Sequence, residues 1–296
     1  MREAGRVICA MTRFSVLFSH MKISTDKEAI EWFLTHAVEN VFPSKETLRT
    51  KLAKGERMTV YLGVDPSGPT LHLGHAIAMQ KLHELQDMGH RVILLIGDFT
   101  AMIGDPTDKM ATRRKLTHEQ VLENYKEYKN QAMAILRFDG ENPVELLFNN
   151  DWLGSLSFAD VVELASHFTV QQMLERDMFE KRIQEGKPVY LHEFLYPLMQ
   201  GYDSVAMDVD LEIGGNDQTF NMLAGRTLMH EIKNKEKAVV ACRLLTDPTG
   251  KKMGKSEGNM ITLNDSSDDI YGKIMSWTDG MIVPGLEICT SMRAEQ

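Results

Sequence analysis

The sequence predicts an α/β fold with a doubly wound parallel sheet, and three observations carry this prediction. Residues 91–97 form a nearly continuous apolar run, which is typical of a strand buried on both faces of a parallel sheet. Residues 58–64 and 237–245 are further strand candidates rich in β-branched side chains. Segments with helical periodicity separate these strands, and such alternation favours βαβ units. Ligands of these sheets bind outside the carboxyl ends of the strands.

The first elements follow from periodicity and turn residues. Residues 26–53 look helical, with apolar side chains spaced for one buried face. The strand at 58–64 ends in a Pro-Ser-Gly turn, and residues 75–86 then predict a helix that Gly89 ends. With the apolar strand that follows, this order makes one strand–helix–strand unit.

The later elements carry clear start signals. Residues 117–120 (TxxQ) and 157–160 (SxxD) are capping patterns that begin two amphipathic helices, with a short strand at 144–148 between them. Residues 207–213 alternate between apolar and acidic side chains, so we expect a half-exposed strand with Glu212 on its polar face.

Composition narrows the function classes. The 296 residues, 43% apolar and 25% charged, are typical of a globular protein with one large or two medium domains. A net charge of −9 argues against nucleic-acid binding over the whole surface. No apolar run approaches the ~20 residues of a membrane span, so no membrane association is expected. Three cysteines without C-x-x-C spacing suggest neither a disulfide framework nor a metal site, and a cytoplasmic location fits.

Residues 1–20 differ from the rest of the chain. They hold three arginines, one acid and a short apolar stretch. They are either an organelle transit peptide, which would make the location organellar, or an extension of uncertain status ahead of a start at Met21.

Two short motifs far apart in the chain have the character of an ATP site. Residues 72–75 (HLGH) offer imidazoles at a predicted helix start, where backbone N–H groups favour anions. Residues 252–256 (KMGKS) offer two ammonium groups and a hydroxyl on a Gly- and Lys-rich loop. A reacting triphosphate needs such groups, because its charge moves. Each motif alone is weak evidence, since surface histidines and solvated lysine turns are common.

This pair of motifs resembles the two signatures of class I aminoacyl-tRNA synthetases. The residues between them narrow the resemblance to the tyrosyl-tRNA synthetases over roughly residues 30–290. It implies a Rossmann-like catalytic domain at 21–265 with an inserted helical region at about 113–190. Residues 266–296 then resemble the start of a truncated helical anticodon-binding domain.

The resemblance also implies site residues. Those that act on the ATP phosphates are His72, His75, Lys252, Lys255 and Ser256. Those that bind tyrosine are Tyr61, Asp105, Tyr196, Gln200, Asp203 and Gln218. Those on the nucleotide side are Gly63, Asp65, Ser67, Gly74, Gly215 and Asp217. In this assignment Asp203 and Tyr61 contact the phenol, Asp217 binds the ribose, and Gly74 lets the adenine lie against the backbone.

Spacing indicates independently that three of these residues form a polar cluster, which the resemblance assigns to the tyrosine pocket. Tyr196, Gln200 and Asp203 lie within two turns of one predicted helix, in an otherwise apolar stretch where a carboxylate is unusual. A site that hydrogen-bonds a hydroxyl leaves its own groups unpaired when phenylalanine enters, and it therefore selects tyrosine.

We therefore expect a ligase that activates tyrosine with ATP to tyrosyl-adenylate and passes tyrosine to tRNA(Tyr). Mg²⁺ is expected to accompany ATP, and transfer to tRNA is expected to be weak in the truncated chain. The alternatives are a non-catalytic synthetase-like binding protein and a different adenylate-forming nucleotidyltransferase.

The resemblance implies a homodimer that pairs through residues 152–178. The residues themselves leave this open, because four apolar side chains of this segment fit an intramolecular core equally well: Phe158, Val162, Phe168 and Met173.

Overall fold

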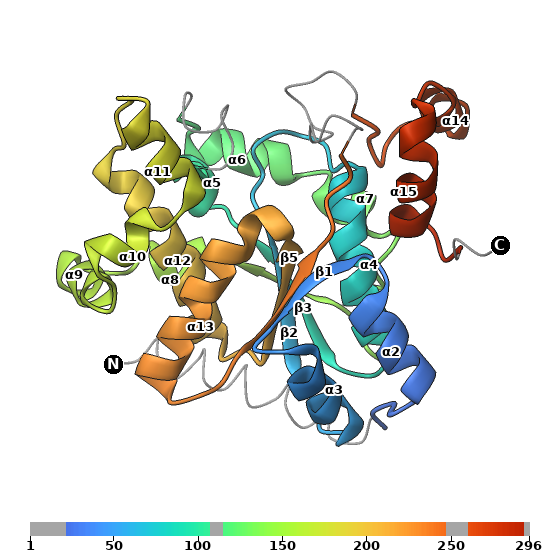
Figure 1. Ribbon diagram of the computed structural model, residues 1–296, viewed down its shortest axis with the longest axis horizontal. Coiled ribbons are helices and arrows are strands. Elements are labelled where there is room, and N and C mark those ends of the chain that lie inside the picture. The colour runs from blue at the N-terminus through green and yellow to red at the C-terminus, as the bar shows by residue number, and fades with distance from the viewer. Residues whose placement is uncertain (1–21, 107–114, 247–259, 293–296) are drawn as a thin grey trace.

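The computed structural model describes residues 22–106, 115–246 and 260–292 (Figure 1). Its centre is a six-stranded sheet in the order β1-β6-β5-β2-β3-β4. Neighbouring strands are parallel except β1, which pairs antiparallel with β6. The strands are β1 (Val38–Phe42), β2 (Thr59–Val64), β3 (Arg91–Ile96), β4 (Glu145–Phe148), β5 (Leu211–Gly215) and β6 (Ala238–Cys242). The predicted doubly wound α/β fold is confirmed.

Helices cover both faces of the sheet. The sheet is seen nearly edge-on in Figure 1, with α12 and α13 on its left and α2 and α4 on its right. The helices up to β5 are α2 (Lys27–Thr35), α3 (Lys45–Ala53), α4 (Leu73–Asp87), α5 (Thr100–Ile103), α6 (His118–Tyr125), α7 (Tyr128–Ala132), α8 (Asn150–Leu153), α9 (Phe158–Ser166), α10 (Val170–Leu174), α11 (Asp177–Gln184) and α12 (Leu191–Met207). After β5 come the 3₁₀ turn η2 (Asn216–Gln218), α13 (Thr219–Lys233), α14 (Ser267–Met275) and α15 (Asp279–Cys289).

The capping patterns begin helices where they were predicted. Thr117 and Gln120 form a reciprocal capping box at the start of α6, and Ser157 and Asp160 do the same for α9. Within residues 113–190, β4 joins the sheet edge, and α8–α11 follow it on the side of α12 (Figure 1). Residues 266–292 form α14 and α15, and α15 packs on α4.

Two predictions about elements were wrong. Residues 26–53 are not one helix, because β1 lies between α2 and α3 and follows Ala37, which has a positive φ of 53°. β5 is not half-exposed, since Glu212 is only 2% exposed and its neighbours Leu211 and Ile213 are buried as well. An ion pair with a buried lysine satisfies the Glu212 carboxylate inside the sheet, which the alternation pattern alone does not reveal.

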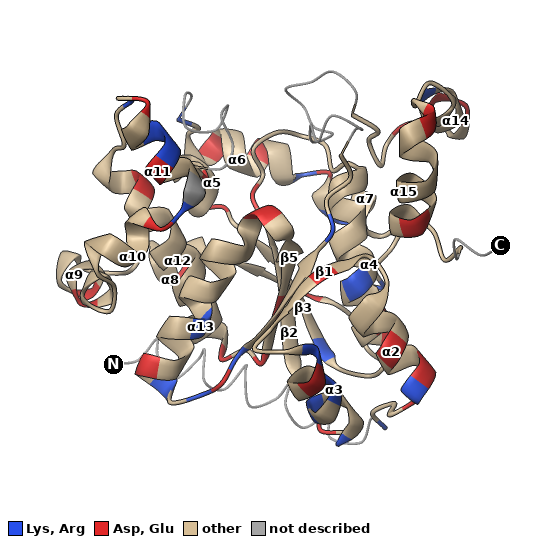
Figure 2. Cartoon of the chain, in the orientation of Figure 1, with Lys and Arg blue, Asp and Glu red and all other residues tan. Residues whose placement is uncertain are grey.

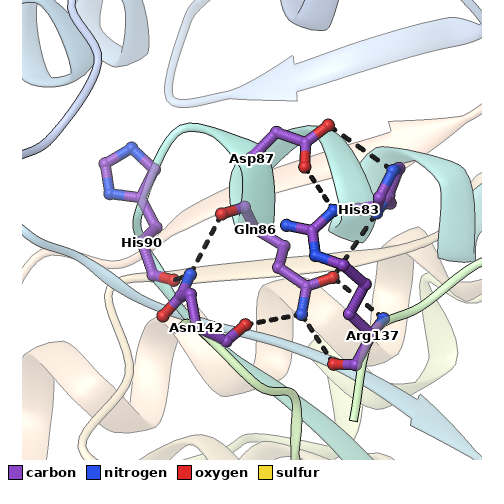
Figure 3. A network of polar contacts seen from close by, with 6 residues as sticks. All are labelled: His83, Gln86, Asp87, His90, Arg137 and Asn142. Carbon is purple, nitrogen blue, oxygen red and sulfur yellow. Dashed lines mark hydrogen bonds and ion pairs between the residues drawn. The ribbon is translucent and has the colours of Figure 1, made fainter. Parts of the chain in front are cut away.

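A polar clamp holds the loop before β4 against the end of α4 (Figure 3). The Asn142 amide donates to the carbonyls of Gln86 and His90 at 3.0 and 2.8 Å. The Gln86 amide donates to the carbonyls of Arg137 and Asn142, both at 2.7 Å. His90 directly precedes β3, so this clamp lies at the amino ends of the strands, away from the edge where ligands of such sheets bind.

Charges of both signs share the surface helices. Figure 2 shows acidic and basic residues side by side on α2 and α3. Arg49 of α3, for example, pairs with Glu31 of α2 at 3.0 Å. Across the described residues, no helix combines the length and apolar character that crossing a membrane requires.

Candidate active site

The predicted site residues that the structure describes lie at the carboxyl ends of the parallel strands. The chain builds β2, β3 and β4 in one direction and then β5 and β6 on the other side of β2, so the topology switches between β2 and β5. The carboxyl ends of β2, β3 and β5 therefore border one crevice. Asp65 follows β2, Asp105 follows β3 and α5, and Gln218 follows β5. α12 adds Tyr196, Gln200 and Asp203.

Asp203 is a buried carboxylate with two fixed donors. It is 3% exposed, and it accepts hydrogen bonds from the Trp152 indole at 2.8 Å and from the Asn149 amide at 3.3 Å. Burial raises the pKa of Asp203 well above its usual value, while the Trp152 and Asn149 donors oppose that rise. The side chain is thus held in one orientation before any ligand arrives.

Tyr61 and Ser204 lie next to Asp203. The Tyr61 side chain is fully buried in β2, and its hydroxyl is 3.0 Å from Ser204 Oγ. Burial, and after it the charges of Glu212 and Asp203, raises the pKa of Tyr61 well above its usual value. Tyr61 is therefore a neutral phenol that retains a hydrogen to donate.

A second pair links α12 to the loop after β2. The Tyr196 hydroxyl donates to Asp65 Oδ2 at 2.7 Å, and the Thr100 hydroxyl donates to Asp65 Oδ1 at the same distance. Burial raises the pKa of Asp65 to about 7, against the effect of these two donors. Asp65 thus changes its protonation near neutral pH.

Asp105 joins two segments distant in the sequence. Its Oδ2 accepts from the Gln218 amide at 2.6 Å, and its Oδ1 lies 3.2 Å from the Arg176 guanidinium. Arg176 itself is 5% exposed, and its guanidinium stands 5.4 and 5.6 Å from the ring centres of Phe179 and Phe220. The residue between α10 and α11 thus holds a carboxylate of the crevice.

His72 and His75 define the start of α4. His72 is the N-cap and accepts from the Gly74 N–H at 3.1 Å, while His75 Nδ1 accepts from the His72 N–H at 3.1 Å. The centres of the two imidazole rings lie 3.9 Å apart. Both imidazoles therefore stand at the positive end of a 15-residue helix, where an anion is favoured.

The segment after the second motif returns to this helix start. The N–H of Leu73 donates to the Ile261 carbonyl, and the N–H of Leu263 donates to the Leu71 carbonyl, both at 3.0 Å. Residues 260–263 thus run antiparallel beside 71–73. Lys252, Lys255 and Ser256 lie outside the described residues.

The remaining nucleotide-side candidates lie on the same edge. Gly63 is an exposed position one residue before the end of β2, Ser67 is exposed, and Asp217 belongs to η2. Neighbouring side chains leave no room for a Cβ at two glycines of this region. A Cβ on Gly74 would lie 2.9 Å from the His72 ring, and one on Gly215 would lie 2.5 Å from Asp217 Oδ1. The apposed His72 ring, rather than an adenine alone, thus accounts for a glycine at 74.

The sequence did not predict the residues whose side chains hold the site residues in place. These are Thr100, Asn149, Trp152, Arg176, Ser204, Glu212 and Lys237. The only available signals were the asparagine that follows the strand at 144–148 and the acid within the strand at 207–213. Neither signal identifies a partner, because each partner comes from a distant part of the chain.

The crevice can bind a cation and select a hydroxyl. Three carboxyl groups (Asp65, Asp105 and Asp203) lie close to the Tyr196 hydroxyl at this end of the strands, with Tyr61 near Asp203, and such surroundings suit an ammonium group. The helix start with two imidazoles lies at the same edge and suits an anion.

Known proteins with similar sequences belong to one family. Residues 53–288 match the family described as tRNA synthetases class I (W and Y). The tyrosine–tRNA ligase of Carboxydothermus hydrogenoformans is 45% identical over 279 residues, which cover 93% of this chain and 67% of that protein. The tyrosine–tRNA ligase of Thermotoga maritima is 46% identical over 273 residues, 92% of this chain and 67% of that one. The chain thus spans about two thirds of the length of these relatives.

Solved structures are similar in fold. A C-terminally truncated mitochondrial tyrosyl-tRNA synthetase of Coccidioides posadasii superposes with a TM-score of 0.72 at 22% identity, over 99% of this chain and 87% of that one. The tyrosyl-tRNA synthetase of Archaeoglobus fulgidus complexed with L-tyrosine has a TM-score of 0.68 at 25% identity, over 85% of this chain and 74% of that one.

Proposed function

Since the chain belongs to the tyrosine–tRNA ligases of the class I tRNA synthetases, an ATP-dependent ligase family, we propose that its crevice joins tyrosine to AMP. The observation that carries this proposal is the buried Asp203 carboxylate, held by Trp152 and Asn149 beside the Tyr61 phenol. A carboxylate fixed in this way suits a substrate hydroxyl. Phenylalanine would leave it without that partner, which costs binding energy.

In this proposal the ammonium of tyrosine binds among Asp105, Tyr196 and Gln200. The acids near this point support the assignment, because Asp65 and Asp105 place negative charge beside the Tyr196 hydroxyl. Gln218 donates to Asp105, so it stands near the substrate carboxylate as well. An ammonium that enters here replaces contacts that Asp105 now makes with protein donors.

ATP is proposed to lie along the start of α4, with its phosphates near His72 and His75. The antiparallel pairing of residues 260–263 with 71–73 supports a role for Lys252, Lys255 and Ser256 at the same phosphates, since the chain returns to α4 directly after them. Asp217 is assigned to the ribose. Gly63, Asp65, Ser67, Gly74 and Gly215 complete the nucleotide side.

Mg²⁺ is proposed to arrive with ATP, held by phosphate oxygens. Among the described residues, no group of three or more His, Cys, Asp or Glu side chains is placed to ligate a metal ion. The proposed chemistry assigns the chain's own residues to positioning and to charge stabilisation.

In the first step a carboxylate oxygen of tyrosine attacks the α-phosphorus of ATP. An O–P bond forms to give tyrosyl-adenylate, and the bond between the α-phosphorus and the bridging oxygen breaks to release pyrophosphate. The histidines and the lysines of the second motif stabilise the charge that moves onto the leaving phosphates. The second step, transfer of tyrosine to the terminal ribose of tRNA(Tyr), is proposed from the family alone.

A homodimer is also proposed, and exposed apolar side chains on the helical region support it. Phe158 is 84% exposed, Leu191 is 82% exposed and Val170 is 68% exposed. Phe158 and the 53% exposed Val162 therefore do not belong to the core of this chain, whereas Met173 does. Large apolar side chains this exposed, on neighbouring helices of one region, favour an interaction surface there. The cytoplasm is proposed as the location.

ATP–pyrophosphate exchange with tyrosine, phenylalanine and tryptophan in parallel tests the proposal. Exchange that depends on tyrosine, with little from the other two amino acids, is the expected result. Folded protein that binds ATP but supports no exchange with any of them would instead favour a non-catalytic synthetase-like binding protein. Exchange with tryptophan but not tyrosine would contradict the role of Asp203.

A further inference from the structure

We propose that the buried ion pair of Lys237 and Glu212 positions the tyrosine pocket from behind. The pair holds the Tyr61 hydroxyl in position at the phenol end and sets the amide orientation of Gln200 at the ammonium end. This inference rests on the proposed function, because Tyr61 and Gln200 are residues of the proposed tyrosine pocket.

Lys237 is a fully buried ammonium whose donors are all used. It directly precedes β6 and is 0% exposed. Its Nζ donates to the Glu212 carboxylate, to Ser204 Oγ at 2.8 Å and to the Met222 carbonyl at 3.2 Å. A Cβ on Gly225 would lie 2.5 Å from this Nζ, so a glycine of α13 leaves the space that the ammonium fills. An ammonium has three N–H donors and no acceptor, and each donor here has its own acceptor.

At the phenol end both members of the ion pair reach Tyr61. Lys237 donates to Ser204 Oγ, which lies 3.0 Å from the Tyr61 hydroxyl. The Tyr61 hydroxyl also hydrogen-bonds the Glu212 side chain, so the ion pair holds this hydroxyl in place beside the proposed phenol site. The Lys237 ammonium also stands 5.7 Å from the centre of the Tyr61 ring.

At the ammonium end the same pair orients an amide. Gln200 Nε2 donates to Glu212 Oε1 at 3.0 Å, on the carboxylate whose other oxygen faces Lys237. With its NH₂ turned to Glu212, Gln200 presents its carbonyl oxygen on the other side. An ammonium needs this acceptor, and a turned amide would present N–H donors to it instead.

Both arms depend on the charge of Lys237. A buried Glu212 without a cation would take up a proton, and a carboxylic acid donates as well as accepts. Gln200 would then lose its fixed orientation, and the Tyr61 hydroxyl would lose the Glu212 and Ser204 contacts that hold it in place. Stability alone does not require such a pair, since well-packed apolar residues often replace buried ion pairs without loss.

The molecule supplies a matched control. Lys81 of α4 is 1% exposed and lies 2.6 Å from Glu84, so it is a second buried lysine–glutamate pair. Its ammonium faces the Phe33 ring and pairs with Glu84, and neither of these is a proposed site residue. Lys81→Met therefore removes a comparable charge without touching the tyrosine pocket.

The test compares the ratio of kcat/KM for tyrosine to that for phenylalanine in ATP–pyrophosphate exchange, together with urea unfolding. Lys237→Met is expected to lower this ratio about tenfold or more, mainly through a higher KM for tyrosine. The double variant with Glu212→Met is expected to regain stability but not the ratio, because no charge is left unpaired. Ser204→Ala, which breaks only the phenol arm, is expected to lower the ratio as well. Lys81→Met is expected to lose stability and keep the ratio within about twofold.

The outcomes separate the two proposals. A stable double variant whose ratio equals that of the wild type would overturn the positioning role and leave the proposed function intact. If the lysine variants do not fold, an unchanged ratio in Ser204→Ala overturns the positioning role assigned at the phenol end. A wild-type protein without tyrosine-dependent exchange would refute the proposed function, and this inference would fall with it.

Discussion

The two ends of the crevice are built differently. At the phenol end, Asp203 and Tyr61 are buried, and each is held by hydrogen bonds to side chains from other elements. At the nucleotide end, His72 and His75 cap the start of their own helix and contact each other's ring. The first end is fixed by distant parts of the fold, whereas the second is organised locally, with residues 261–263 beside it.

This difference matches two tasks. Selection of a hydroxyl requires groups that stay in place when the wrong substrate enters, since only then does an unpaired carboxylate cost energy. Stabilisation of a moving phosphate charge requires groups that meet the transition state, so their loss lowers kcat. Under the proposed function, the phenol end decides which amino acid binds, and the nucleotide end decides how fast it reacts.

The largest effect is expected from Asp203→Ala. The change removes the acceptor of the substrate hydroxyl and leaves the Trp152 and Asn149 donors unpaired, so kcat/KM for tyrosine should fall by about 10³-fold. ATP–pyrophosphate exchange measures it, and Asp210→Ala is the control. Asp210 is a carboxylate that accepts from the Thr59 N–H at 2.9 Å, at the opposite edge of the sheet. Equal losses of kcat/KM in both variants would show that the effect is not specific to the carboxylate at the phenol end.

A smaller effect of a different kind is expected from His75→Ala. Loss of one donor to the reacting phosphates should lower kcat about 10²-fold and change KM for tyrosine by less than about threefold. His83→Ala, on the other end of α4, is the control and should retain full activity. A variant in which KM rises and kcat stays constant would assign His75 to tyrosine binding instead.

Asp65 gives a pH-dependent difference. Burial raises its pKa from 3.8 to about 7, so the folded state keeps a proton that the unfolded state releases, and this carboxyl lowers stability as pH rises from about 4 to about 7. Asp65→Asn lacks this titration. The free energy of unfolding of the variant minus that of the wild type should therefore be about 1–3 kcal/mol larger at pH 8 than at pH 5. Urea unfolding at both pH values measures it, and an identical difference at both would contradict the burial of an ionising Asp65.

The smallest effect on the site itself is expected from Phe158→Asp. Phe158 is the first residue of α9 and 84% exposed, so an acid there should leave the stability of one chain unchanged within about 0.5 kcal/mol. Sedimentation velocity should show loss of the proposed dimer. Val283→Asp, at a 55% exposed apolar position on α15, is the control and should sediment as the wild type does. The opposite pattern would place the contact on α15.

Local signals in the sequence predicted much of this architecture. The buried strand at 91–97, the capping boxes and the three polar residues of α12 all depend on neighbours within a few positions. β1 was missed because a five-residue edge strand between two helices carries no periodic signal of its own. Lys237 and Glu212 lie 25 positions apart, and only the pairing of β5 with β6 brings them together. For the same reason, the groups that hold Asp203 and Asp105 could not be assigned from the sequence.

The most direct test of the account is calorimetric titration with tyrosine and with phenylalanine in the absence of ATP. If the phenol end is set before the nucleotide arrives, tyrosine should bind alone, and its preference over phenylalanine should equal the preference seen in exchange. If tyrosine binds only together with an ATP analogue, or if both amino acids bind with equal affinity, the phenol end is not the fixed selector described above.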